Sequence, residues 1–293
     1  MTELETPLLE PSDVQIPQVL PILPLRETVV FPESMTPLAI GQERSIKLVD
    51  DVVAADRMLA LLTSRDHEKE APGFEDLYAV GTAAVIHKMI RVPDGTLRIL
   101  VQGVGRIRVQ GHTQDDPYLV GEFELVPDEV EETPELEALT RSVQTEFGRL
   151  ISLVPYLPSE LELAAANVDD PGALSHLVAS TLRLKTEEKQ ALLEEADVSA
   201  RLRDVLRILK RELEVVELGT KIQSQVQSEL EKGQREYFLR QQLKAIQEEL
   251  GEGDEQQAEL KELRQQVEEK NLPEDTRKAV DRELSRLEKL PPA

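Results

Sequence analysis

The stretch IRVPDGTLRI, from Ile90 to Ile99, decides the fold expected for the first part of the chain. At its centre, Asp94 and Gly95 can adopt the positive φ angles of a tight two-residue turn, which is typical of a β-hairpin. Further short β-branched runs, separated by glycine and proline, extend from Val19 to Val126. Together they predict a small, mostly antiparallel β-domain.

A two-residue turn would also fix which residues of the hairpin share a face. It places Ile90, Val92, Leu97 and Ile99 on a core face, and it places Met89 directly opposite Leu100 on the other face, beside the polar residues Arg91, Arg98, His87 and Gln102. A flexible thioether beside a leucine on an otherwise polar face suits loose recognition of varied apolar segments. Alternatively, a helix or the N-terminal segment covers this pair and makes it part of the core.

One helix and one connection complete the first part of the chain. The segment ERSIKLVDDVVAAD predicts a helix because Ile46, Val49 and Val53 recur at helical spacing. We therefore expect residues 1–120 to form a β-rich domain with one helix. Residues 121–140 carry eight acids, no base and two prolines, which is typical of a solvated connection that leads into a helix.

Helix start signals dominate the rest of the sequence. They are a Thr-Pro pair at Thr133, a capping box at Ser159, an Asp-Pro pair at Asp170 and a Thr-Glu-Glu run at Thr186. These signals predict a helical bundle over residues 134–196. The absence of proline then allows a long helical arm over residues 197–251, and two shorter helices are expected to form a hairpin over residues 254–293. The predicted fold class is α+β.

The helical arm carries an adjacent pair of aromatic residues, Tyr237 and Phe238. On a helix the two side chains lie about 100° apart, so they cannot share one stripe. One is expected to continue the seam of Leu239, Leu243 and Ile246, and the other to face a different partner in an assembly. Alternatively, both pack within the chain's own helices. Gly219 and Gly233 are candidate bends, because glycine weakens a helix by about 1 kcal/mol relative to alanine.

Composition argues against several classes of function. A net charge of -23 repels the phosphate backbone of nucleic acids, and no basic stripe offsets that charge. The sequence has no cysteine, and no apolar run reaches the roughly 18 residues that a membrane span needs. We therefore expect a cytoplasmic protein that binds neither nucleic acid nor membrane.

Motifs for catalysis and for cofactor binding are missing from the sequence. None of the 14 glycines is followed by lysine, so there is no phosphate-binding P-loop, and the four histidines are too scattered to present two imidazoles to a metal. No serine lies in a G-x-S-x-G motif. The chain is therefore predicted to be non-catalytic, with no catalytic residue, no cofactor and no metal site.

Two stretches resemble a known family. LPILPLRETVVFPESMTPLAIG, residues 20–41, and REYFLRQQLKAIQEELG, residues 235–251, closely resemble the N-terminal region of bacterial Lon, the ATP-dependent AAA+ protease. The resemblance covers essentially the whole chain, up to LEKLPPA. The ATP-binding motifs and the Ser-Lys protease dyad of the family have no matching positions, so the chain is expected to be truncated before the ATPase module.

The spacing of Leu202, Leu206, Leu209, Leu213 and Val216 predicts a coiled-coil seam in the arm, which shifts frame from Ile222 onward. The resemblance implies a β-fold similar to the PUA-like class and a cytoplasmic homohexamer. It also implies that the substrates are misfolded or degron-bearing proteins, and that ATP and magnesium bind only to the missing ATPase-protease module. Met89 and Leu100 are then expected to bind substrate, with Met35 and Ile22 as neighbours. The alternative function is a stand-alone scaffold or holdase-like protein-binding module. A PUA-like fold also suggests RNA binding, against which the charge argues.

Overall fold

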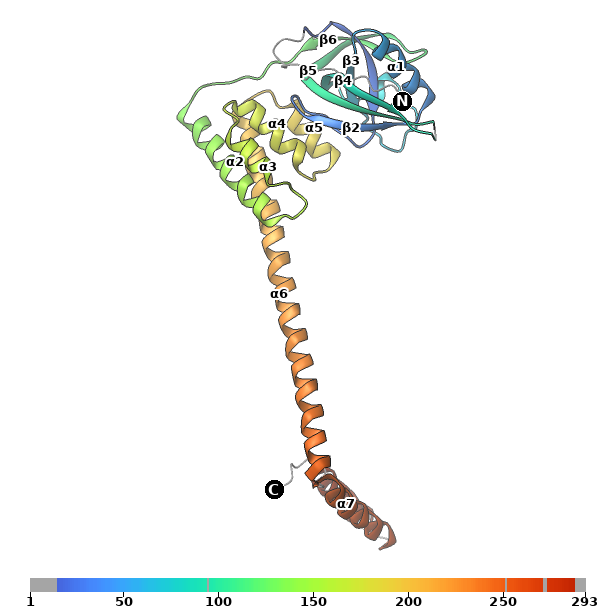
Figure 1. Cartoon of the computed structure of the whole chain (residues 1–293), viewed down its shortest axis with the longest axis vertical. Coiled ribbons are helices and arrows are strands. Elements are labelled where there is room, and N and C mark those ends of the chain that lie inside the picture. The colour runs from blue at the N-terminus through green and yellow to red at the C-terminus, as the bar shows by residue number, and fades with distance from the viewer. Residues whose placement is uncertain (1–14, 94, 251, 271–272, 288–293) are drawn as a thin grey trace. The chain divides into compact units, whose positions relative to one another are not determined.

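The computed structural model describes residues 15–93, 95–250, 252–270 and 273–287. The chain divides into two compact units, Met1–Glu217 and Leu218–Ala293, and each is described by itself. The first unit combines a β-sheet with helices, and the second is helical (Figure 1). The predicted α+β class is confirmed.

A six-stranded sheet forms the N-terminal part of the first unit. Its strands are β1 (Val19–Leu25), β2 (Met35–Ile40), β3 (Met58–Thr63), β4 (Val80–Arg91), β5 (Leu97–Gln114) and β6 (Val120–Leu125), in the order β2-β5-β4-β3-β1-β6. Because β6 also pairs with β5, the strands other than β2 close into a ring. Helix α1 (Glu43–Ala54) and the 3-10 helix η2 (Phe74–Asp76) lie between strands. Of the strand pairs, β1 with β3 is parallel and the rest are antiparallel.

The register of the β4–β5 hairpin differs from the prediction by one residue. The Val92 N–H donates to the Thr96 carbonyl over 2.9 Å, so the loop holds three residues and not two, with Gly95 at φ 87°. Arg91 therefore pairs with Leu97, and Met89 pairs with Ile99. A three-residue loop that ends in a left-handed glycine is also a common hairpin connection. The prediction of a two-residue turn was wrong, and Asp94 itself lies outside the described residues.

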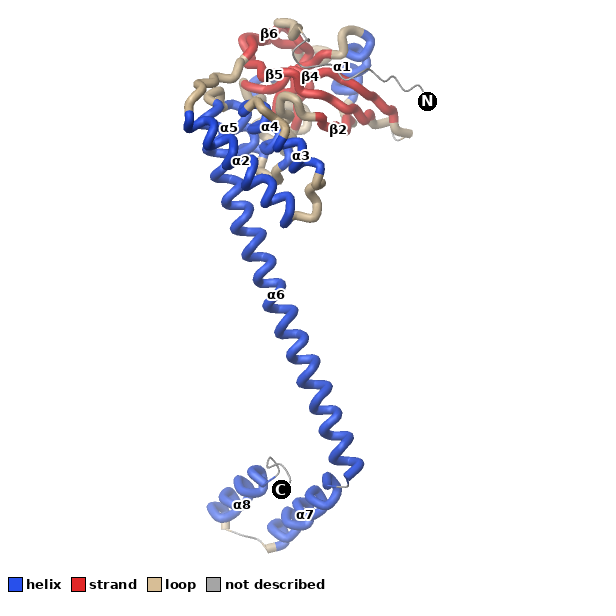
Figure 2. The backbone as a smooth tube through the Cα atoms, turned by 60° about the vertical axis from the view of Figure 1, so that its left-hand side comes forward, coloured by secondary structure: helices blue, strands red, loops and turns tan. Residues whose placement is uncertain are grey.

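The helices of the first unit gather beside the sheet (Figures 1 and 2). They are α2 (Pro134–Leu153), α3 (Glu160–Ala166), α4 (Pro171–Thr181), α5 (Thr186–Glu194) and the start of α6 (Val198–Leu250). The Thr133 hydroxyl caps α2 by accepting from the Leu136 N–H at 3.1 Å, and the Asp170 carboxylate caps α4 by accepting from the Gly172 N–H at 2.7 Å. Ser159 precedes α3 without a side-chain cap, because its backbone is already helical.

A shared apolar core joins the sheet to these helices. Phe31 is fully buried and Val80 nearly so, and both belong to the same cluster as Phe147 of α2 and Leu202 of α6. Two other clusters fill the interior of the sheet, one of them covered by Leu48, Val49 and Val52 of α1. The β-rich and helical parts are thus packed against each other. Residues 121–125, predicted as the start of a solvated connection, belong to β6, and the chain from Val126 to Thr133 that leads into α2 is mostly exposed.

The second unit begins within α6 and continues with α7 (Glu252–Glu269) and α8 (Glu274–Leu287). Helix α6 is continuous through Gly219 and Gly233, so neither glycine ends it. In α8, the side chain of Leu284 is buried, with 6% of its surface exposed. Within the described part of the chain, no helix combines the length and the apolar composition that crossing a membrane requires.

Candidate protein-binding surfaces

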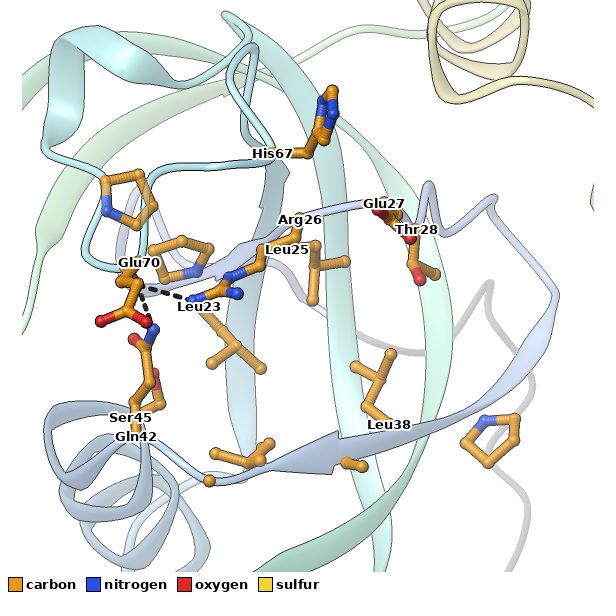
Figure 3. A pocket seen from close by; sticks show the side chains of 16 residues that line it. Leu23, Leu25, Arg26, Glu27, Thr28, Leu38, Gln42, Ser45, His67 and Glu70 are labelled. Carbon is orange, nitrogen blue, oxygen red and sulfur yellow. Dashed lines mark hydrogen bonds between the residues drawn. The ribbon is translucent and has the colours of Figure 1, made fainter.

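A pocket of about 610 Å³ lies where β1 and β2 fail to pair (Figure 3). Strand β1 pairs with β6 through Val19–Pro21, and the Ile22 N–H also donates to the Leu119 carbonyl at 2.8 Å. From Leu23 onward, β1 is open on that side among the described residues. Strand β2 is bonded to β5 alone in the described part of the sheet. The two strands therefore leave a gap, and the residues of that gap line the pocket.

The pocket has an apolar floor and a polar side. Leu23, Leu25 and Leu38 line it, and their side chains are 2–8% exposed because they also belong to the core. On one side, Arg26 and Gln42 both donate hydrogen bonds to the backbone carbonyl of Glu70 (Figure 3). These bonds tie the loop after β3 to both β1 and the start of α1.

Beside the pocket, the solvent-facing surface of the sheet carries what we call the outer strip: Met35 and Pro37 of β2, Leu100 of β5 and Ile90 of β4. Pro37 of β2 pairs with Leu100 of β5. Two residues away on β5, Arg98 also faces outward, and it pairs with Ile90 of β4. Met35 is 41% exposed and Ile90 47% exposed, and Leu100 is half-buried. Side chains alternate along a strand, so their neighbours Leu38 and Ile99 point into the core.

A buried charged cluster holds the sheet against the helical bundle. Asp128, in the connection between β6 and α2, accepts hydrogen bonds from Arg106 of β5 at 2.5 Å and from Arg201 of α6 at 2.6 and 3.0 Å. Both arginine side chains are almost fully buried. They also donate to neighbouring groups, Arg106 to the carbonyls of Pro127, Leu193 and Glu195, and Arg201 to the Ser175 hydroxyl.

Electrostatics in this cluster follow from burial and from the two guanidinium groups. Burial alone would raise the pKa of Asp128, but the hydrogen bonds and charge of Arg201, with the charge of Arg106, outweigh it and lower that pKa below its usual value. Burial, aided by the positive charge of Arg201, lowers the pKa of His176 to about 3, so this imidazole is neutral at physiological pH. The hydrogen bonds that the two arginines donate all end on protein oxygens, so the cluster acts as a structural clamp.

Two apolar stripes run along the exposed part of α6 in the second unit. Taking about 100° per residue, Ile222, Val226, Leu230 and Tyr237 all lie within about 80° of one another, and they form the first stripe. Leu239, Leu243 and Ile246 lie within about 60° of one another and form the second stripe. All of these side chains are at least half exposed.

The two stripes face different directions. Leu239 is about 200° around the helix from Tyr237, and Phe238 lies between them. Tyr237 thus belongs with the residues that precede it, and it does not continue the Leu239 seam. Phe238, at 60% exposed, belongs to neither stripe. The aromatic pair marks the point where the apolar face of α6 changes side.

Comparison with known proteins identifies the family. The family described as the ATP-dependent protease La (LON) substrate-binding domain matches residues 19–211. The chain belongs to this family. Its relatives include the Lon protease of Dictyoglomus thermophilum, 44% identical over 94% of this chain and 35% of that protein, and the Lon protease of Syntrophus aciditrophicus, 41% identical over 99% of this chain and 37% of that protein. The chain spans about a third of the length of these relatives.

A solved structure supports the same assignment. The N-terminal domain of a Mycobacterium avium complex Lon protease matches with a TM-score of 0.55 and 25% sequence identity, over 66% of this chain and 98% of that one. The resemblance to the N-terminal region of Lon that the sequence motifs indicated is confirmed. The outer strip and the pocket both lie within the part of the chain that matches the Lon substrate-binding domain.

The structure does not bring the four predicted substrate-binding residues together. Met35 and Leu100 lie near each other on the outer strip, because Met35 and Pro37 follow the same face of β2. Met89 is half-buried and packs against the core, because the one-residue shift in register turns it inward. Ile22 is fully buried inside the sheet, where it pairs with Ala60. Met89 and Ile22 are therefore corrected to core residues.

Sequence reasoning missed Ile90 and Pro37 of the outer strip. Ile90 was assigned to the core by the wrong register. Pro37 could have been found, because proline inside a strand favours an edge position. The predicted assembly residues, Tyr237, Phe238, Leu239, Leu243 and Ile246, are 53–67% exposed. Their role in assembly stays a prediction.

Proposed function

We propose that this chain is the region of a Lon-type ATP-dependent protease that captures misfolded or degron-bearing polypeptides and that supports assembly of the hexamer. The observation that carries the first part is the outer strip, which leaves Met35 and Ile90 exposed on the substrate-binding domain of the family. Clustered apolar side chains at a surface are typical of protein-binding sites. The longer relatives named Lon protease support this function over that of a stand-alone scaffold.

Capture of unfolded protein can be tested by removing the outer strip. A Met35→Ser, Ile90→Ser double variant keeps the core intact, because both side chains point away from it. We expect its affinity for a fluorescently labelled unfolded protein, measured by anisotropy, to fall severalfold. A matched control is Leu163→Ser on α3, which removes a side chain that is 68% exposed but distant in the fold. Equal binding by the wild type and the double variant would refute the assignment.

The stripes of α6 support the part of the proposal that concerns assembly. Because the two stripes face different sides, the helix offers surfaces to two separate neighbours. The first stripe ends at Tyr237, so neither stripe is long enough for a sustained coiled coil by itself. We expect the isolated chain to be a monomer or a small, concentration-dependent oligomer in sedimentation velocity, and a Val226→Ser, Tyr237→Ser variant to shift it toward monomer. A stable hexamer formed by this chain alone would contradict this expectation.

Catalysis is assigned to the remainder of the protease. We expect the purified chain neither to hydrolyse ATP nor to cleave unfolded casein, since the sequence carries no P-loop and no nucleophile motif. ATP turnover that stays with the protein through successive purification steps would overturn this part of the proposal.

A further inference from the structure

We infer that the pocket between β1 and β2 holds an extended segment of the bound polypeptide, which adds to the free edge of β2 as an extra strand. This inference rests on the proposed function and specifies how the substrate is held. It is carried by three features: the direction of the backbone groups of β2, the prolines on both sides of the pocket and the apolar floor.

The hydrogen-bond pattern shows which backbone groups of β2 are directed at β5. Just before β2, the Gly103 N–H donates to the Ser34 carbonyl at 3.0 Å, and the Glu33 N–H donates to the Gly103 carbonyl at 2.9 Å. In an antiparallel ladder the bonded residues recur at every second position. Ser34 is such a bonded residue, and the pairing of Met35 with Gln102 continues the same register. Within β2 the bonded residues are therefore Thr36, Leu38 and Ile40.

The intervening residues of β2 therefore direct their backbone groups away from β5. They are Met35, Pro37 and Ala39, and Pro37 and Ala39 line the pocket. The edge that faces the pocket thus presents the Ala39 N–H and the carbonyls of Pro37 and Ala39. Such an edge is a template for another strand.

The opposite wall of the pocket is the second half of β1. The Leu25 carbonyl accepts from the Ser64 N–H at 2.7 Å, and Leu25 is in register with Thr63 of β3. Because parallel pairs also bond at alternate residues, the backbone of Leu23 and Leu25 is directed at β3 and that of Pro24 at the pocket. Pro24 and Pro37 both lack an N–H, so β1 and β2 are poorly suited to pair with each other. The gap between them stays open for a third segment.

An incoming polypeptide is a better occupant than a second copy of this chain. A second β2 edge would bring its own Pro37 and would again lack a donor, which is how natural edge strands resist pairing with themselves. An unfolded segment without proline supplies a donor at every residue. Its alternate side chains would lie on the floor of Leu23, Leu25 and Leu38. Main-chain bonds with an apolar floor favour extended apolar segments of varied sequence.

A proline scan of the β2 edge tests the inference. Ala39→Pro removes the free N–H but leaves the β2–β5 ladder intact, because that N–H is directed at the pocket. The probe is a fluorescein-labelled peptide of alternating valine and threonine, with lysines at both ends for solubility. We expect the Ala39→Pro variant to bind the probe about tenfold more weakly, since it loses a hydrogen bond and the ring obstructs the edge. The matched control, Ala39→Val, keeps the N–H and should bind about as well as the wild type.

Two further measurements do not depend on the folding of the proline variant. Pro37→Ala adds a donor to the same edge, and it should bind the probe severalfold more tightly. A probe with N-methyl groups on alternate amides keeps its side chains but loses donors on one edge, and the wild-type chain should bind it about tenfold more weakly.

The possible results separate this inference from the proposed function. The first case is that the wild type binds both the probe and unfolded protein. If Ala39→Pro then binds the probe as well as the wild type does, and the wild type binds the N-methylated probe equally well, strand addition alone would be overturned. Failure of the wild type to bind any unfolded protein would overturn the proposed function and this inference together. Self-association of Pro37→Ala in sedimentation, without tighter binding of the probe, would assign the edge to a second copy and overturn the assignment to a substrate segment.

Discussion

Leu209 and Leu230 belong to the same helix, α6, but their surroundings are opposite. Leu209 is fully buried in the core that α6 shares with the sheet and the bundle, whereas Leu230 is 57% exposed in the second unit. The two parts of α6 have similar apolar periodicity, but among the described residues only the apolar face of the first part is buried against its own unit. Periodicity therefore indicates that a helix has an apolar face, but not whether that face is covered by the same chain.

The largest difference between the two regions is expected from a variant that breaks the buried clamp of the first unit. Asp128→Ala would leave Arg106 and Arg201 buried without a counter-charge, so we expect the free energy of unfolding of the first unit to fall by about 3–5 kcal/mol. Urea denaturation followed by circular dichroism would measure the change. The control is Glu236→Ala, which removes the exposed partner of Arg240 on α6 and should leave the unfolding midpoint unchanged. An unchanged midpoint for Asp128→Ala would show that the clamp contributes little.

The next largest difference in stability is expected between alanine variants of Leu209 and Leu230. Leu209→Ala creates a cavity in the core and should cost about 2–5 kcal/mol of unfolding free energy. Leu230→Ala removes only an exposed side chain from a helix, so it should leave the first unit as stable as the wild type. The same urea titration checks both variants. Equal losses from the two would mean that Leu230 is covered in solution, which would point to self-association.

Glycine-to-alanine substitutions are expected to change stability in opposite directions in the two regions. A Cβ atom at Gly103 would lie 2.2 Å from the Phe31 carbonyl oxygen, so Gly103→Ala forces the backbone apart and should destabilise by about 1–3 kcal/mol. A Cβ atom at Gly233 would meet nothing within 4 Å, so Gly233→Ala should stabilise the helix by about 1 kcal/mol. Thermal melts followed at 222 nm would report both. Destabilisation by Gly233→Ala would show that a partner packs closely against that part of α6.

The smallest expected effect is a dependence of stability on pH that belongs to the first unit. Burial lowers the pKa of His176 to about 3 from its ordinary value of 6.5, so below pH 6.5 the unfolded chain binds a proton that the folded chain does not. Stability therefore falls as pH decreases, by about 1–2 kcal/mol between about pH 6.5 and 5. Asp128 is ionised in both states within this window and contributes only at lower pH, where its lowered pKa adds a further loss of stability as pH falls.

A His176→Leu variant provides the control for this dependence. Its unfolding free energy should vary less with pH over the same window, whatever its absolute stability. A wild-type stability that does not change between pH 6.5 and 5 would contradict the burial of a neutral histidine. Tris and other buffers with large heats of ionisation should be avoided if calorimetry is used.

The sequence predicted the elements better than their contacts. The β-branched runs, the Thr133 and Asp170 caps and the long α6 were found because each depends on neighbouring residues. The hairpin register was missed because Gly95 can end a three-residue loop as readily as it can follow Asp94 in a two-residue turn. That single extra residue exchanged Met89 and Ile90 between the two faces of β4.

The clamp could not be predicted from local patterns, since Arg106, Asp128 and Arg201 are far apart in sequence. One signal was present, however. Arg201 lies between Val198 and Leu202 at the start of the apolar seam of α6, and all three are buried. A charge at a core position needs a partner, so it could have led to a search for a buried acid. The free edge of β2 had a signal as well, because proline within a strand favours an edge position and Pro37 lies inside β2.

The order of strands in the sheet has a consequence for synthesis on the ribosome. Strand β1 is made early, but its partners β3 and β6 follow it at increasing distance, and β6 ends only at Leu125. Arg201, which binds Asp128, is synthesised more than seventy residues after it. Long-range pairing of this kind slows folding and leaves apolar strands unprotected for longer. The interior of the sheet can close once β6 is made, but Phe31 and Val80 stay uncovered until the helices that pack on them, including the start of α6, have left the exit tunnel.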